Sequence, residues 1–161
     1  MTLATINFNQ RDFGPEIEKG SVSFVGGFSP LLASSVKEVL LESEENLTSG
    51  SRGRLHWVES DNFSFVQCVE VINDLSDIEI ITQTIYQELL GLIPELKNQN
   101  RIRFWNCVPD INAGDGDAEV DKRFCSGRLS GFENGGFSPS DFPAASALGG
   151  HQSILTIHML T

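Results

Sequence analysis

Arginines are the residues of this chain whose type and spacing best suit ligand chemistry. Arg123 and Arg128 stand five positions apart in the stretch DKRFCSGRLSGF, with Cys125 between them. The planar guanidinium of an arginine matches a carboxylate through two parallel hydrogen bonds, and Gly127 beside Arg128 could let a ligand approach. We therefore select Arg128 over Arg123 as the candidate carboxylate-binding residue. A helix that carries two solvated arginines explains the same stretch and stays open.

The stretch RIRFWNCVPDIN, at residues 101–112, predicts a strand that leads into a turn. In period two, Arg103 and Trp105 share one side of this strand, and Phe104 and Asn106 share the other. One side has the character of a core, and the side of Arg103 and Trp105 has that of a ligand site or a subunit contact. Asn106 is either a buried, hydrogen-bonded residue or the mark of a β-bulge.

The stretch PAASALGG, at residues 143–150, contains only small residues around one leucine. It permits a turn whose exposed backbone amides can hold an anion, with Ala145 and Ser146 as the candidate positions. A tight, well-packed connection explains the stretch without any ligand.

Composition restricts the partners of the chain. It has 22 acidic and 11 basic residues, and the formal net charge of -11 repels phosphate backbones and anionic membranes. We expect no nucleic-acid and no membrane partner. Three scattered histidines and three distant cysteines predict no metal site. A length of 161 residues suits one domain, over residues 1–161. Because the chain shows no apolar leader and no apolar run long enough to span a membrane, we expect a cytoplasmic protein.

The spacing of apolar residues predicts two helices that could position the candidate residues. Ser76 and Glu79 match a capping box before a helix whose apolar residues recur at steps of three and four up to Leu96. A second helix is predicted from about Asp117, as N-cap, to Phe132, with Val120 and Phe124 inward; it is weakened by Gly127 and Gly131.

Strands complete the pattern. RLHWVES and NFSFVQCVEVIN predict a hairpin whose second strand is covered on both faces, and SILTIHMLT predicts an edge or near-edge strand. Residues 35–42 fit a helix or a strand, and SEENLTSGSRG predicts a loop. The order of elements predicts an α+β fold, a mixed β-sheet with two helices packed on one face.

Taken in order, VGGF, ITQTIYQELL, RIRFWNCVPDIN, RFCSGRLSGF and PAASALGG resemble the chorismatase family, which is built on RidA-like (YjgF-like, chorismate mutase-like) units. The resemblance implies true or pseudo-threefold assembly, ligand pockets between units, and no metal or organic cofactor. It also implies hydrolysis of the enol ether of chorismate by general acid catalysis. The chain resembles the N-terminal half of the family. The other half supplies the glutamate regarded as the catalytic acid, and Cys107 stands where the family usually has tyrosine.

Three functions remain as alternatives under this resemblance. The first is a chorismatase-like homotrimer that binds chorismate or a related small cyclic carboxylate between subunits and hydrolyses its enol ether. The second is a non-catalytic binding or partner subunit that assembles with a related chain. The third is a RidA-like enamine or imine deaminase, which would need an arginine where Ala145 stands. The candidate ligand-binding residues are Arg128, Arg103, Trp105, Cys125, Ala145 and Ser146, and the candidate acids are Glu119 and Glu70.

Overall fold

The computed structural model describes residues 2–8, 16–18, 21–25, 36–42, 47–150 and 153–161. The described chain forms a six-stranded sheet of order β5-β6-β7-β10-β8-β9 and a four-stranded sheet of order β2-β3-β1-β4. The strands are β1 Thr2–Phe8, β2 Glu16–Glu18, β3 Ser21–Val25, β4 Val36–Glu42, β5 Thr48–Arg52, β6 Leu55–Glu59, β7 Ser64–Val71, β8 Arg103–Pro109, β9 Ala144–Gly150 and β10 Ile154–Leu160. The helices are α1 Ile78–Leu92 and α2 Val120–Asn134, with short 3₁₀ turns at Leu75–Asp77, Ile93–Glu95, Gly116–Ala118 and Pro139–Asp141.

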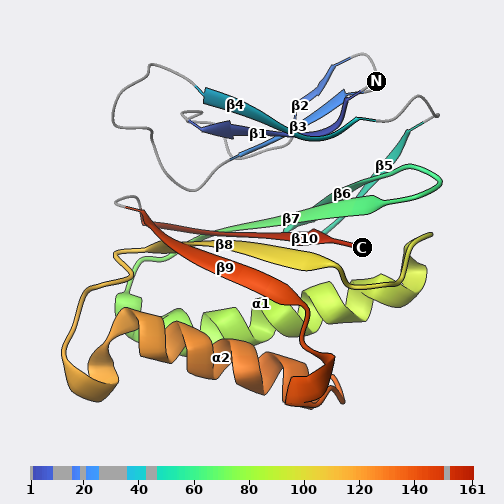
Figure 1. Cartoon of the computed structure of the whole chain (residues 1–161). Helices are drawn as coiled ribbons and strands as arrows, with labels where there is room; N and C mark the ends of the chain where they lie inside the picture. The colour runs from blue at the N-terminus through green and yellow to red at the C-terminus, as the bar shows by residue number, and fades with distance from the viewer. Residues whose placement is uncertain (1, 9–15, 19–20, 26–35, 43–46, 151–152) are drawn as a thin grey trace.

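Both long helices lie on one face of the six-stranded sheet, and the four-stranded sheet lies over its other face (Figure 1). The α+β fold with two helices on one face of a mixed sheet is therefore confirmed. The ambiguous segment 35–42 forms strand β4 where it is described. The predicted loop after it is wrong over Thr48–Arg52, which pair with β6 as strand β5, while residues 43–46 lie outside the described residues.

The hairpin prediction is confirmed, because β6 and β7 pair antiparallel from Leu55 with Cys68 to Glu59 with Ser64. Strand β7 lies between β6 and β10. Phe65 and Gln67 on one face and Val66 and Cys68 on the other are all buried. Strand β7 is thus covered on both faces, as its apolar pattern predicted.

The last two strands differ from the prediction, one in its position in the sheet and the other in being a strand at all. The segment 153–161 was expected at or near an edge, but β10 lies between β7 and β8, with both faces buried. The stretch 143–150 was expected as a turn, but Ala144–Gly150 form the outermost strand, β9. The cause is the β8–α2–β9 crossover, which pairs β9 in parallel with the outer side of β8.

Helix α1 begins differently from its predicted capping box. The carboxylate of Asp74 accepts a 2.8 Å hydrogen bond from the backbone N–H of Ser76, and a 3₁₀ turn precedes the helix. Glu79 instead accepts a 2.7 Å hydrogen bond from the hydroxyl of Ser126 on α2. The box is wrong because the 3₁₀ turn moves the start of the α-helix to Ile78.

Helix α2 also starts later than predicted, because Gly116–Ala118 form a 3₁₀ turn and Glu119 is the N-cap in place of Asp117. Its glycines hold it against α1. A Cβ at Gly127 would overlap the backbone carbonyl of Glu79, and one at Gly131 would lie 2.6 Å from Cβ of Tyr86. Gly127 therefore admits the α1 backbone, and its predicted role of admitting a ligand is wrong.

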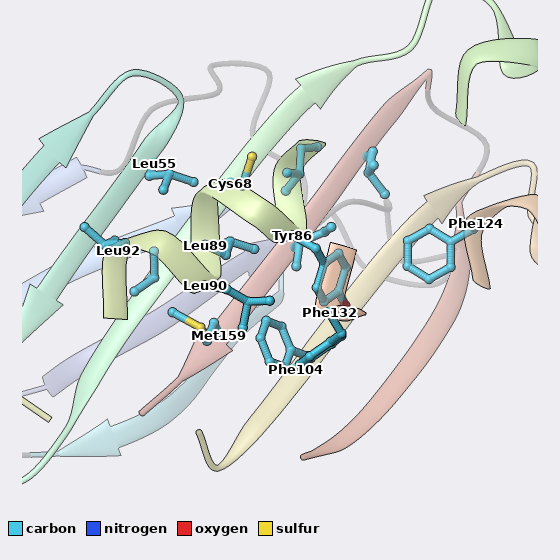
Figure 2. Close-up of a cluster of buried hydrophobic side chains, with 14 of the residues drawn as sticks. Leu55, Cys68, Tyr86, Leu89, Leu90, Leu92, Phe104, Phe124, Phe132 and Met159 are labelled. Carbon is cyan, nitrogen blue, oxygen red and sulfur yellow. The ribbon is translucent and has the colours of Figure 1, made fainter. Parts of the chain in front are cut away.

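Aromatic rings fill the layer between the helices and the sheet. Figure 2 shows Tyr86, Phe132 and Phe104 next to one another over β8, with ring centroids 5.2 Å apart for Tyr86 and Phe104 and 5.4 Å apart for Tyr86 and Phe132. Val120 and Phe124 point inward, as predicted. Burial of one such aromatic side chain stabilises the fold by roughly 1.5–3 kcal/mol, so this cluster fixes α2 on the sheet.

Candidate functional site: an arginine among aromatic rings

Arg128 lies against three aromatic rings. The central carbon of its guanidinium is 5.9 Å from the ring centroid of Tyr86, 5.6 Å from that of Phe132 and 5.8 Å from that of Phe142. Such distances allow cation–π attraction, which is stronger for a desolvated cation than for a solvated one. The Nε atom of Arg128 is buried and has no hydrogen-bond partner in the described part of the chain. The aromatic rings thus hold a cation without neutralising it.

A line of hydrogen bonds crosses the sheet beside this arginine. The Tyr86 hydroxyl donates a 2.7 Å hydrogen bond to Oδ1 of Asn106, and Nδ2 of Asn106 donates a 2.9 Å bond to the backbone carbonyl of Ser146 on β9. Asn106 is buried and the β8–β9 register is unbroken, so the hydrogen-bonded alternative is confirmed and the bulge is wrong. Burial raises the pKa of Tyr86 far above its usual range, against smaller opposite effects of Arg128 and Asn106, so the hydroxyl remains a donor.

The sheet separates the predicted ligand-binding residues into two groups. Arg103 and Trp105 alternate with Phe104, so they face away from the helices. The Arg103 guanidinium lies 5.3 Å from the Trp105 ring centroid, and this ring lies 6.1 Å from that of Phe65. Phe65 in turn stacks on His158 at 5.5 Å. Figure 1 shows the four-stranded sheet on the face opposite the helices, so this second group, which faces away from the helices, lies on the side of the four-stranded sheet.

The remaining predicted ligand-binding residues lie on α2 and β9. Cys125 is exposed on α2, with its Sγ 3.8 Å from a carboxylate oxygen of Asp121, and partial burial together with this carboxylate raises its pKa. Ala145 and Ser146 lie on β9, paired with Phe104 and Trp105. The structure therefore brings Ser146 next to the Tyr86–Asn106 line through its backbone carbonyl.

The two candidate acids lie in different elements. Glu70 on β7 accepts a 2.7 Å hydrogen bond from Arg54, which also donates a 3.0 Å bond to Glu88. Glu119 precedes α2 and lies 3.6 Å from the ammonium of Lys122. Among the hydrogen bonds and ion pairs of the described residues, none joins either glutamate to Arg128. Their catalytic role stays a prediction.

Tyr86 and Phe142 were not selected from the sequence. A signal for Tyr86 was present, because the single tyrosine of the chain stands in the apolar stripe of a helix. A buried tyrosine hydroxyl needs a hydrogen-bond partner, and Asn106 was the polar residue of the core-facing strand. Phe142 precedes β9 in sequence and reaches Arg128 only through the crossover, so no local pattern identifies it.

Three arginines on the β8–β9 side of the sheet have no carboxylate oxygen within 4.0 Å in the part of the chain that the structure describes. Within the described residues, no ion pair within 4.0 Å reaches Arg101, Arg103 or Arg128, and the Nε atom of each is buried without a hydrogen-bond partner. Arg101 lies 4.0 Å above the ring of Phe137. By contrast, Arg52 pairs with Glu95, and Arg54 pairs with Glu70 and Glu88.

The described ranges contain neither a cluster of metal ligands nor a membrane-spanning helix. No group of three or more histidine, cysteine, aspartate or glutamate side chains there could hold a metal ion. No helix there is long and apolar enough to cross a membrane.

Comparison with known proteins identifies relatives of this chain. It is 28% identical over 113 residues to a chorismatase of Streptomyces rapamycinicus, covering 70% of this chain and 33% of the relative. It is 30% identical over 80 residues to a 3-hydroxybenzoate synthase of Streptomyces hygroscopicus, covering 49% of this chain and 24% of that protein. A crystal structure of a chorismatase superposes with a TM-score of 0.74 at 22% identity, over 98% of this chain and 47% of the solved chain.

The chain thus spans about a third of the length of the curated chorismatases and about half of the solved chain, with which it shares its fold. Residues 38–161 match the family described as "Chorismatase FkbO/Hyg5-like, N-terminal". This range includes α1, α2 and all six strands of the larger sheet. The chain belongs to the FkbO/Hyg5-like chorismatase N-terminal family.

Proposed function

We propose that this chain is a ligand-binding unit of a chorismatase-type protein, in which Arg128 binds a carboxylate of chorismate or of a related small cyclic carboxylate. The observation that supports this function is the guanidinium of Arg128, held among three aromatic rings with no carboxylate partner in the described residues. In a chain of net charge -11, acidic side chains to neutralise it are abundant. A partly desolvated arginine without such a partner suits an external anion.

The ring system around Arg128 favours a cyclic ligand. Phe142 packs against Phe132 in a tilted arrangement with 4.2 Å between ring centroids, and both rings lie within 6 Å of the guanidinium carbon of Arg128. An unsaturated ring gains contact area against such side chains while its carboxylate meets the guanidinium. The names of the relatives, a chorismatase and a 3-hydroxybenzoate synthase, point to carboxylates on six-membered rings.

Hydrolysis of an enol ether is a further proposal beyond binding. It needs an acid that protonates the methylene carbon, after which water attacks the resulting cation and pyruvate leaves. Glu70 is already engaged by Arg54, an arrangement that suits a structural role, and Glu119 lies at the surface end of α2. Because the candidate residues supply ligand-binding groups more clearly than a catalytic acid, we favour ligand binding over hydrolysis as the function.

Assembly is part of the proposal. Arg128 lies on the outer side of the domain beside β9, so a neighbouring unit could close the site, as a homotrimer or with a related chain. The alternative of a RidA-like deaminase would place Ala145 against the substrate carboxylate, and its methyl group offers no hydrogen bond.

Titration calorimetry with chorismate and with 3-hydroxybenzoate tests the ligand. We expect Arg128→Lys and Arg128→Gln to raise the dissociation constant at least about tenfold, since a lysine cannot reproduce the two-pronged contact of an arginine. Arg123→Lys is the matched control on the same helix, because Arg123 bonds the backbone carbonyl of Ser76, and we expect wild-type affinity for it.

Circular dichroism confirms that each variant is folded, and pyruvate release with chorismate measures hydrolysis separately. Equal affinity of the Arg128 and Arg123 variants, or no binding of either ligand by folded wild-type protein, contradicts the proposed function.

A further inference from the structure

Tyr86 lies against Arg128 because α2 packs on α1 through a glycine. Gly131 stands three residues after Arg128, and a Cβ there would lie only 2.6 Å from Cβ of Tyr86. Residues three apart share one face of a helix, so Arg128 also points toward Tyr86, with 5.9 Å between the guanidinium carbon and the ring centroid. Tyr86 is fully buried, and close packing therefore holds its ring in place.

The direction of the hydrogen bond at the Tyr86 hydroxyl is fixed from strand β9. The backbone carbonyl of Ser146 can only accept, so the side-chain amide of Asn106 must turn its Nδ2 toward this carbonyl, at 2.9 Å. Oδ1 of Asn106 then faces Tyr86 and accepts the tyrosine proton at 2.7 Å. Because this proton is committed to Asn106, the Tyr86 oxygen offers only its lone pairs to any other group.

Arg128 is the cation next to these lone pairs. Burial raises the pKa of Tyr86, and the charge of Arg128 together with a side-chain hydrogen bond from it acts in the opposite direction. An arginine has five N–H donors and no acceptor, so it suits an oxygen whose own proton points elsewhere. A bond to Tyr86 uses one donor and leaves others of the guanidinium for a ligand.

We propose that Tyr86 is a positioning residue, whose oxygen accepts a hydrogen bond from Arg128 and holds the guanidinium in the orientation that binds a ligand carboxylate. The inference rests on the proposed function, because it concerns how that site binds its ligand. Cation–π attraction acts over a whole ring face and specifies no single orientation, whereas a hydrogen bond has a preferred angle. A guanidinium that is ordered before the ligand arrives lowers the entropic cost of binding.

The single tyrosine of the chain gives this contact its own spectroscopic signal. Tyrosine labelled with carbon-13 at the hydroxyl-bearing carbon yields one resonance, from Tyr86, in the full chain. We expect Arg128→Gln to shift this resonance. Arg123→Lys should leave it in place, because Arg123 on the same helix bonds the backbone carbonyl of Ser76. Titration with 3-hydroxybenzoate should shift the wild-type resonance along the binding curve that calorimetry gives.

The affinity for 3-hydroxybenzoate separates positioning from stability. Tyr86→Phe keeps the ring against Arg128 and removes the oxygen, so we expect the dissociation constant to rise at least about fivefold. Ile85→Val is the matched control, because Ile85 is a buried neighbour on α1 whose lost methylene destabilises the core and leaves the tyrosine hydroxyl intact. We expect wild-type affinity for this control. Circular dichroism verifies that each variant is folded, and the labelled wild-type protein tests the contact if Tyr86→Phe does not fold.

Three results overturn the positioning role and leave the proposed function intact. The first is wild-type affinity of folded Tyr86→Phe for a ligand whose binding depends on Arg128. The second is a Tyr86 resonance that neither Arg128→Gln nor the ligand shifts. The third is an equal loss of affinity in Ile85→Val, which would assign the effect to stability. Absence of binding by folded wild-type protein overturns the proposed function and the positioning role together.

Discussion

The hydroxyl of Tyr86 donates a 2.7 Å hydrogen bond to the side-chain oxygen of Asn106 inside the layer between α1 and the sheet. Both residues are buried, and Asn106 passes the connection to the backbone of β9. Two hydrogen bonds therefore connect helix α1, strand β8 and the edge strand β9, next to the guanidinium of Arg128.

Removing this hydroxyl should destabilise the fold. In Tyr86→Phe the ring contacts to Phe104 and Phe132 remain, but the buried oxygen of Asn106 loses its donor, which lowers the free energy of unfolding by about 1–3 kcal/mol. Urea denaturation measures this change. In a double-mutant cycle with Asn106→Ala, we expect a coupling of at least about 0.5 kcal/mol, and strictly additive effects would show that the bond does not stabilise the protein.

The glycines of α2 give a prediction with a matched control. Gly127→Ala and Gly131→Ala place a methyl group into α1, and such overpacking costs typically about 1–3 kcal/mol of unfolding free energy. Gly91→Ala on α1 meets nothing within 4 Å, so the same substitution there should stabilise the protein by about 0.4–1 kcal/mol. Thermal and urea unfolding compare the three variants. If Gly91→Ala were as harmful as the others, helix packing would not be the cause.

Cys68 should make the protein sensitive to alkali. Burial raises the pKa of its thiol from 9.0 to about 12, with Arg54 acting in the opposite direction. Above pH 9 the unfolded chain loses this proton and the folded chain keeps it, so stability is complete below that pH and falls between pH 9 and about 12. The slope contributed by one such group is at most about 1.4 kcal/mol per pH unit.

The measurement is the urea unfolding free energy from neutral to alkaline pH in wild type and in Cys68→Ala. The variant should show a shallower fall, while Cys125→Ala, which changes an exposed thiol, should keep most of the wild-type slope. Identical slopes in wild type and Cys68→Ala would exclude the buried thiol as the cause.

The start of α1 depends on Asp74. Hydrogen bonds from Ser76 hold the pKa of this carboxyl below its usual value, so its ionised form stabilises the turn, and this stability is lost as the pH falls through the lowered pKa. Asp74→Ala should therefore lower the melting temperature at neutral pH more than in acid. Asp77→Ala, which removes an exposed aspartate without a side-chain cap bond, should lower it less. Equal shifts at both positions would assign the effect to charge near the helix dipole alone.

Local sequence determined most of the elements of the larger sheet and helix layer. Apolar steps of three and four placed α1, alternation in RIRFWNCVP placed β8 and assigned Phe104 and Asn106 to the core, and two-sided apolarity placed β7 in the interior. These patterns can be read from the sequence because a helix or strand that buries one face carries apolar residues at its own structural period. The family resemblance rested on the same stretches, and residues 38–161 carry it.

Only the tertiary structure decided which strand lies at the edge and which residues meet at Arg128. The β8–α2–β9 crossover puts β9 outside β8 and leaves β10 in the middle, although β9 consists of small residues suited to a turn. It also carries Phe142 to Arg128 and turns Gly127 toward α1. Period and composition describe one element at a time, whereas these contacts join elements far apart in sequence, so packing alone fixes them.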